Sequence, residues 1–260
     1  MRLVILTSNR RNTASYCLPL LLERTNATVV KVIFCENQVV RDMKFYKRKL
    51  QKVMKIGVLG ALNGIRLRNW YTGGGLKSTL RDIGDICQDA GLKFVTVPSL
   101  RDLEAVKEME EAKADLCLSL GNSYIPRKIF SIPRYGTINI HGEVLPDFKN
   151  AQSVIWQIYQ GSTSTGYTIH QVDSGIDTGS ILKQEAFPIL FRDTLEVTVR
   201  DTSDEILSRA ALGLVDVINR WEDHLAKARP QGKGGHYTTP TYREYRRMLV
   251  RFEQLKKQQH

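Results

Sequence analysis

The 260-residue chain lacks several features that would assign it to a class at once. No stretch approaches the ~20 apolar residues that a membrane helix needs. The apolar start at residues 1–7 is also shorter than a signal-peptide core of roughly 7–15 residues. We therefore expect a cytoplasmic protein that begins with a buried strand. Apolar residues make up 42% and charged residues 25%, which excludes collagen-like, low-complexity and wholly disordered chains.

Spacings that bind metals or form disulfides are missing too. None of the four cysteines forms a Cys-x-x-Cys pair, so we predict small buried residues without a role. The five histidines are spread too widely for a His-x-x-x-His or similar pair, and no metal site is predicted.

Glycine is absent where a phosphate-binding loop needs it. Residues 7–13 follow the first predicted strand without a glycine, which excludes the G-x-G-x-x-G motif there, and the chain has no P-loop. Ser8, Asn9 and Thr13 nevertheless lie where a strand meets a helix N-terminus. Hydroxyl, amide and backbone N–H groups there suit a phosphate, although a simple N-cap is slightly favoured.

Acidic residues are outnumbered, because 38 Lys and Arg face 27 Asp and Glu and give a formal charge of +11. Two segments carry this excess. Residues 41–55 hold seven basic residues and one aspartate, and residues 220–260 hold ten basic and four acidic residues. A polyanion, a phosphate-bearing substrate and a solvated helix face are each compatible with this pattern.

Short apolar runs rich in β-branched residues alternate with helix-like stretches in the first 140 residues. The predicted strands are residues 3–6, 28–34, 94–97, 116–120 and 136–140. The predicted helices are residues 14–24, 41–55, 78–90 and 101–113, and residues 63–75 predict a helix that runs out into a glycine-rich loop. This alternation predicts an α/β fold with a Rossmann-like, open, mostly parallel, doubly wound sheet.

Later in the chain the pattern changes to a hairpin followed by long helices. Residues 166–172 and 180–184 alternate with period two around a turn-rich loop, which predicts a hairpin. A long amphipathic helix is predicted over residues 194–220. After a break rich in proline and glycine, a last helix is predicted near residues 241–257.

Asn139 and His141 end the fifth predicted strand two residues apart, so their side chains leave the same face. Ligands of parallel sheets bind beyond the carboxyl ends of the strands. There an amide can donate to a developing oxyanion, and an imidazole can share that task or move a proton. The alternative is that both side chains satisfy backbone groups.

Asp173 and Asp177 bracket the loop of the predicted hairpin. A carboxylate there can accept a proton or hold a basic partner, but from the residues alone an Asx turn is favoured. His170 lies in mid-strand, and we interpret it as a hydrogen-bonded core residue.

Three spaced motifs together resemble the active-site region of the formyltransferases that use N10-formyltetrahydrofolate. They are N-x-H-x-x-x-L-P at residues 139–146, T-G-x-T-x-H at 165–170 and D-x-x-x-D-x-G at 173–179. Such a resemblance implies a formyltransferase catalytic domain over residues 1–215 and a C-terminal extension, residues 216–260, with a loop and a basic helix. Two placements of that helix stay open, on the main domain or against a second subunit of a homodimer.

By this resemblance Asn139, His141 and Asp177 form the catalytic trio. Asn139 and His141 would stabilise the oxyanion that forms when a substrate amine adds to the formyl carbon. Asp177 would accept the amine proton and keep His141 in its working state. N10-formyltetrahydrofolate is implied as co-substrate, with no metal and no covalent enzyme intermediate.

The resemblance also implies two sets of binding residues. The folate would lie against two loops that recognise it mainly through the backbone, at Leu118, Leu120, Gly121, Tyr124, Val172, Asp173 and Ile176. The acceptor would bind near Ser8, Asn9, Arg10, Lys77, Lys149, Asn150 and Gln152. Basic members of this set suit a diphosphate, and Trp70 or Tyr71 suits stacking on a base, although an ordinary surface or packing role is favoured for each. Lys149-Asn150, Ser153 and Glu143 depart from the family pattern and leave the acceptor open.

Three branches of the family differ in their acceptor. Methionyl-tRNA formyltransferases add a C-terminal barrel-like domain, and glycinamide ribonucleotide formyltransferases carry a glycine-bearing phosphate loop after the first strand. Residues 216–260 are predicted to hold only a loop and a helix, and residues 7–13 have no glycine. The predicted branch is therefore the sugar N-formyltransferases, which act on nucleotide-linked amino sugars such as GDP-perosamine in O-antigen and lipopolysaccharide synthesis.

Two alternatives stay open beside this branch. One is a formyltransferase for methionyl-tRNA or another amine. The other is a non-catalytic RNA-binding module, which is disfavoured because few aromatic residues besides Tyr242 and Tyr245 are interleaved with the basic ones. Folate and the sugar nucleotide are thus the predicted partners, and no membrane partner is expected.

Overall fold

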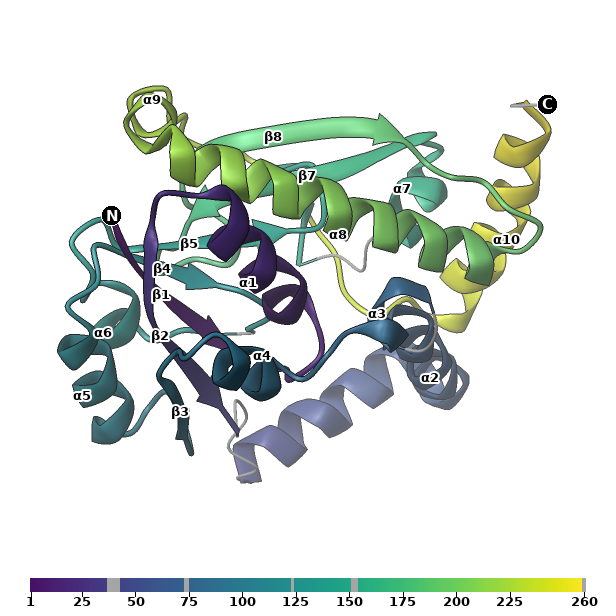
Figure 1. Cartoon of the computed structure of the whole chain (residues 1–260). Coiled ribbons are helices and arrows are strands. Elements are labelled where there is room, and N and C mark those ends of the chain that lie inside the picture. Colours follow the sequence, from purple (N-terminus) through teal and green to yellow (C-terminus); the bar gives the residue numbers. More distant parts are fainter. Residues whose placement is uncertain (37–42, 73–74, 123, 151–153, 259–260) are drawn as a thin grey trace.

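A seven-stranded sheet forms the centre of the computed structural model, which describes residues 1–36, 43–72, 75–122, 124–150 and 154–258 (Figure 1). The strand order is β3-β2-β1-β4-β5-β7-β8. Neighbouring strands from β3 to β5 pair in parallel, whereas β7 pairs antiparallel with both β5 and β8. The bounds are β1 Arg2–Thr7, β2 Thr28–Cys35, β3 Phe94–Val97, β4 Leu116–Ser119, β5 Thr137–His141, β7 Ser164–Gln171 and β8 Ile181–Pro188. The predicted mostly parallel α/β sheet and the predicted hairpin are confirmed.

Both faces of the sheet are buried, because the side chains of each parallel strand alternate between two cores. Leu3 and Ile5 of β1 belong to the larger core, whereas Val4 and Leu6 belong to the smaller one. Helices α1 (Thr13–Arg24) and α8 (Leu195–Asn219) cover the first face, and α5 (Leu103–Ala112) and α6 (Arg127–Phe130) cover the second (Figure 1). The four cysteines are buried, as predicted.

Three predicted helices differ from the structure. The helix expected over residues 41–55 continues as α2 (Met43–Thr72), with non-helical backbone at Gly57 (φ 75°, ψ 164°), so the helix expected from residue 63 is its second half. The helix expected over 78–90 is two helices, α3 (Gly75–Thr79) and α4 (Ile83–Asp89). Asp82 separates them because its carboxylate accepts a hydrogen bond from Gly84 N–H and caps α4. Residues 73–74 of the predicted loop lie outside the described residues.

The C-terminal segment packs onto the same body as the sheet. Helix α9 (Trp221–Ala226) follows α8, and α10 (Tyr242–Gln258) packs against α2 and α7 (Ile155–Gln160). A short parallel pair, β6 (Phe148–Lys149) with β9 (Gly235–His236), adds a second link. Of the two placements left open for the last helix, the structure shows the one on the main domain. The division at residue 215, which falls inside α8, stays a prediction.

Among the helices that the structure describes, none combines the length and apolar character needed to cross a bilayer.

Candidate active site

The carboxyl ends of β4 and β5 border a cavity of about 340 Å³. Members of the predicted trio and of both predicted folate loops line it together, namely Gly121, Tyr124, Asn139, His141, Val172, Asp173, Ile176 and Asp177. Asn150 and His170 also line it. The topology thus gathers these residues at the position where ligands bind in parallel sheets.

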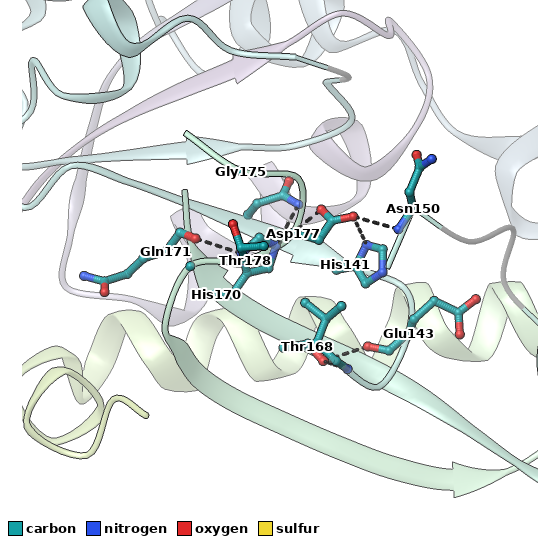
Figure 2. Close-up of polar contacts among 12 residues, drawn as sticks. His141, Glu143, Asn150, Thr168, His170, Gln171, Gly175, Asp177 and Thr178 are labelled. Atoms are coloured by element: carbon teal, nitrogen blue, oxygen red, sulfur yellow. Dashed lines mark hydrogen bonds and ion pairs between the residues drawn. The ribbon is translucent and has the colours of Figure 1, made fainter. Parts of the chain in front are cut away.

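Asn139 and His141 project from one face of β5, which lies between β4 and β7. Nε2 of His141 lies 2.9 Å from the carbonyl oxygen of Phe148. Because a carbonyl only accepts, Nε2 carries the proton of this hydrogen bond. Nδ1 then faces Oδ2 of Asp177 at 3.7 Å (Figure 2).

Asp177 lies on the loop between β7 and β8, with its backbone in the left-handed region at φ 51°. Its Oδ2 accepts a hydrogen bond of 3.0 Å from the N–H of Asn150. Its Oδ1 lies 3.9 Å from Nε2 of His170. The carboxylate therefore faces two histidines, and the Asx turn favoured from the residues alone is wrong for Asp177.

Asp173 makes the Asx turn instead. Its Oδ1 accepts hydrogen bonds from the N–H of Gly175 at 3.0 Å and from the hydroxyl of Thr178 at 2.6 Å. The two acids of this loop therefore differ in role, because Asp173 shapes the loop and Asp177 faces the cavity.

His170 belongs to this site, although the sequence analysis did not include it among the site residues. It is buried on β7 directly opposite Asn139, which confirms the prediction of a hydrogen-bonded core histidine. Nδ1 donates to the carbonyl of Gln171 at 2.8 Å, which leaves Nε2 to accept from the Asn139 amide at 3.3 Å. Burial is the main cause that lowers the pKa of His170, so the ring stays neutral near pH 7. The signal was the last position of the T-G-x-T-x-H motif.

The first predicted folate loop is anchored to the end of β1. Leu118 and Leu120 are buried in the core, so their side chains lie away from the cavity. The carbonyl of Gly121 accepts hydrogen bonds from the Ser8 hydroxyl at 2.8 Å and the Asn9 amide at 2.9 Å. Polar side chains of the β1–α1 loop thus hold the loop for which folate binding is predicted.

The basic residues of the predicted acceptor set each bond to another part of the chain. Arg10 pairs with Asp82 at 3.1 Å, and the Lys77 ammonium donates to the carbonyl of Tyr71 at 3.0 Å. The Lys149 ammonium donates to the carbonyl of Gly232 at 3.3 Å. Of this set Asn150 lines the cavity, and Gln152 lies outside the described residues.

Two further residues of the acceptor prediction are buried. Trp70 packs in the core against Tyr245, which agrees with the packing role favoured for it and leaves it unable to stack on a base. Glu143 is fully buried, and its backbone carbonyl accepts from the hydroxyl of Thr168 at 2.7 Å. Burial, and then the charge of Glu143, raise the pKa of Tyr71. This departure from the family pattern therefore places a carboxyl group close to Tyr71.

Comparison with known proteins shows the family. The profile of the formyl transferase family matches residues 1–211, and the chain belongs to this family. Methionyl-tRNA formyltransferase of Bacteroides fragilis is 30% identical over 146 residues, a match that covers 56% of this chain and 45% of that protein. The chain thus spans less than half the length of this curated relative.

Two solved structures share the fold. Glycinamide ribonucleotide transformylase 1 of Symbiobacterium toebii has a TM-score of 0.60 and 17% identity, covering 89% of this chain and 94% of that chain. The N-formyltransferase of Helicobacter canadensis, solved with folinic acid and dTDP-3-aminofucose, has a TM-score of 0.57 and 18% identity, covering 96% of this chain and 80% of that chain. The predicted formyltransferase fold is confirmed.

Proposed function

We propose that this protein transfers a formyl group from N10-formyltetrahydrofolate to the amino group of a nucleotide-linked amino sugar. The observation that supports it most is the cavity that Asn139, His141 and Asp177 share with both predicted folate loops. Membership of the formyl transferase family supports the formyl chemistry. The dTDP-amino sugar bound to the Helicobacter neighbour supports the class of acceptor.

The cavity suits a folate as formyl donor, which supplies an electrophilic formyl carbon when bound. Beside the polar Asn122, Tyr124 and Asp173, the two predicted loops line the cavity with the small or apolar residues Gly121, Val172, Gly175 and Ile176. A planar ring can therefore approach the backbone closely. The ionisable side chains of the trio lie at the β5 side, where the formyl group has to be placed.

His141 and Asn139 supply the hydrogen bonds for the negative charge that develops on the formyl oxygen. The Nε2 proton of His141, now held by the Phe148 carbonyl, is available to a formyl oxygen that takes the place of this carbonyl. One N–H of the Asn139 amide is directed at His170, which leaves the other for the same oxygen. Donors of this kind are worth roughly 3–4 kcal/mol each in comparable enzymes.

Asp177 accepts the proton that the attacking amine releases, directly or through one water molecule. After the amine has added to the formyl carbon, the bond from that carbon to N10 of the folate would break as the oxyanion collapses, and the proton held by Asp177 would pass to N10. The carboxylate lies 3.7 Å from Nδ1 of His141, so it also stabilises the ring if it becomes charged during the transfer.

The β1–α1 loop favours a sugar nucleotide over glycinamide ribonucleotide as acceptor. It lacks the glycine-bearing phosphate loop, and its Ser8 and Asn9 donors are directed at Gly121. Methionyl-tRNA is the second candidate acceptor, because the curated relatives are named methionyl-tRNA formyltransferases and the chain has two basic segments. GDP-perosamine is the specific sugar nucleotide that we propose to test first.

The test is formyl transfer from N10-formyltetrahydrofolate to GDP-, dTDP- and UDP-linked 3- and 4-amino sugars, with charged initiator tRNA as a parallel acceptor. We expect turnover with one sugar nucleotide. Transfer to the tRNA and to no sugar would contradict the proposed acceptor. If neither transfer nor folate binding is measured, the catalytic proposal fails, and salt-sensitive RNA binding becomes the next measurement.

A further inference from the structure

Helix α2 carries a row of exposed apolar side chains that no described element covers. Of the 15 large apolar side chains exposed in the described residues, eight lie on this helix. They are Met43, Tyr46, Leu50, Met54, Val58, Leu59, Leu62 and Ile65, each 53–83% exposed. Single exposed apolar residues are ordinary, whereas a continuous group marks an interaction surface.

These residues, which we call the α2 stripe, follow helical spacing within each half of α2, on either side of the non-helical Gly57. Met43, Tyr46, Leu50 and Met54 recur every three or four residues, so they share one face of the first half of the helix. The helix packs on α8 and α10 through other residues, and its buried Leu67 and Trp70 belong to the same core as residues of those two helices. Figure 1 shows α2 along the lower edge of the molecule, outside the helices that cover the sheet.

The charge of α2 has one sign. The helix has eight Lys and Arg residues and no Asp or Glu. The basic residues are Lys44, Lys47, Arg48, Lys49, Lys52, Lys55, Arg66 and Arg68. An occupant of the stripe therefore has to offer apolar groups and negative charge together.

This requirement separates three kinds of occupant. A second copy of α2 would bring like charges together, which is unfavourable at helix-packing distances. RNA would neutralise the basic residues but leave the apolar stripe in water. An anionic bilayer satisfies both, because lipid headgroups attract Lys and Arg while apolar side chains enter the acyl boundary.

We propose that α2 docks the protein on the surface of an anionic lipid bilayer, with the α2 stripe facing the lipid. The helix lies in the interface and does not cross the membrane. The sequence-based expectation of no membrane partner rests on the lack of a spanning segment and of a leader core. An interfacial helix needs neither feature.

The experiment is cosedimentation of the full chain with vesicles of phosphatidylcholine alone or mixed with phosphatidylglycerol. We expect binding to the anionic vesicles only, and weaker binding as salt increases. The double variant Leu50→Gln/Met54→Gln should bind at least ~10-fold more weakly, because it removes apolar groups that enter the lipid. The matched control is Leu103→Gln/Val250→Gln, which changes two exposed apolar residues on other helices and should bind like the wild type.

Both variants alter exposed side chains, so circular dichroism and thermal unfolding should match the wild type. Absence of binding to anionic vesicles would overturn the proposal, as would equal loss of binding in the control variant. A dimer that dissociates in Leu50→Gln/Met54→Gln would assign the stripe to a second copy. RNA binding without vesicle binding would assign the basic residues to nucleic acid.

Discussion

The amide of Asn139 is oriented by the tautomer of a buried histidine, His170. Because His170 donates through Nδ1 to Gln171, its Nε2 is an acceptor, and the Asn139 atom that faces it has to be the amide nitrogen. Asp177 lies within 4 Å of both His141 and His170 but hydrogen-bonds to the backbone of Asn150. These side chains thus already provide the hydrogen-bond donor and the carboxylate acceptor that the proposed reaction needs.

Changing the trio tests these roles directly. His141→Ala and Asp177→Asn should each lower kcat/KM for formyl transfer by at least ~100-fold, because each removes a donor or a proton acceptor of the transition state. Steady-state kinetics with the accepted amine measures this. The control Asp193→Asn removes an exposed carboxylate and should leave kcat/KM unchanged. Near-normal turnover in both trio variants would show that the roles are assigned wrongly.

His170 should make stability depend on pH. Its pKa is lowered mainly by burial, so below its ordinary value of 6.5 the unfolded chain binds a proton that the folded state excludes. The free energy of unfolding should therefore decrease as the pH falls from 7 to 5. Urea unfolding of the wild type and His170→Gln at both pH values measures the difference, and the variant should lose part of this decrease. An equal decrease in both proteins would mean that other groups cause it.

At the scale of elements, the packing of α8 on β7 depends on a residue without a side chain. Gly213 lies in the buried face of α8, and a Cβ there would collide with the ring of Tyr167. Tyr167 is fully buried on β7, and its hydroxyl bonds to Glu185 of β8 at 3.1 Å, so the ring has little room to move. Close approach of the helix to the hairpin therefore requires glycine.

Gly213→Ala should destabilise the protein, although alanine normally stabilises a helix interior by about 1 kcal/mol relative to glycine. The clash with Tyr167 should outweigh this gain and lower the free energy of unfolding by about 1–3 kcal/mol. Thermal and urea unfolding measure the change. Leu212→Ala, at an exposed position of the same helix, should change stability by less than about 0.5 kcal/mol. A higher Tm for Gly213→Ala would contradict the packing explanation.

Over the whole molecule, one core joins the sheet to the C-terminal helix. Met248 and Phe252 of α10 lie in the same core as residues of β1 and α8, and the Phe252 ring stacks on Phe191 with centroids 5.9 Å apart. The pair of β6 with β9 brings the C-terminal segment beside Phe148, whose carbonyl contacts His141. The C-terminal segment therefore supports both the core and one wall of the site.

Phe252→Ala should lower the free energy of unfolding by about 3–5 kcal/mol, because it opens a cavity in this shared core. The change should appear in one cooperative transition, followed equally by far-UV circular dichroism and tryptophan fluorescence. Val250→Ala, two residues away and exposed, is the control and should have little effect. A separate early transition that affects only α10 would show that the segment folds as an independent unit.

Local pattern was enough to predict much of this protein. Strand β3 and helix α8 lie within a residue of their predicted bounds, because a short apolar, β-branched run marks the strand and apolar residues at helical spacing mark the helix. The spacing of Asn139 and His141 placed both on one face of β5, and the three motifs indicated the family. These features depend on neighbours in sequence, which is why the sequence alone determined them.

Tertiary structure decided what no local pattern contains. The antiparallel pairing of β5 with β7 set His170 opposite Asn139, and the loop after β7 turned Asp177 toward His141 while Asp173 closed a turn. The continuation of α2 past Gly57 and the burial of Trp70 depend on contacts with α8 and α10. An aspartate in this loop can form a turn or face the site, and the local sequence does not distinguish the two conformations. Strand register and long-range packing decide between them, because the free-energy difference between the two conformations comes from residues distant in sequence.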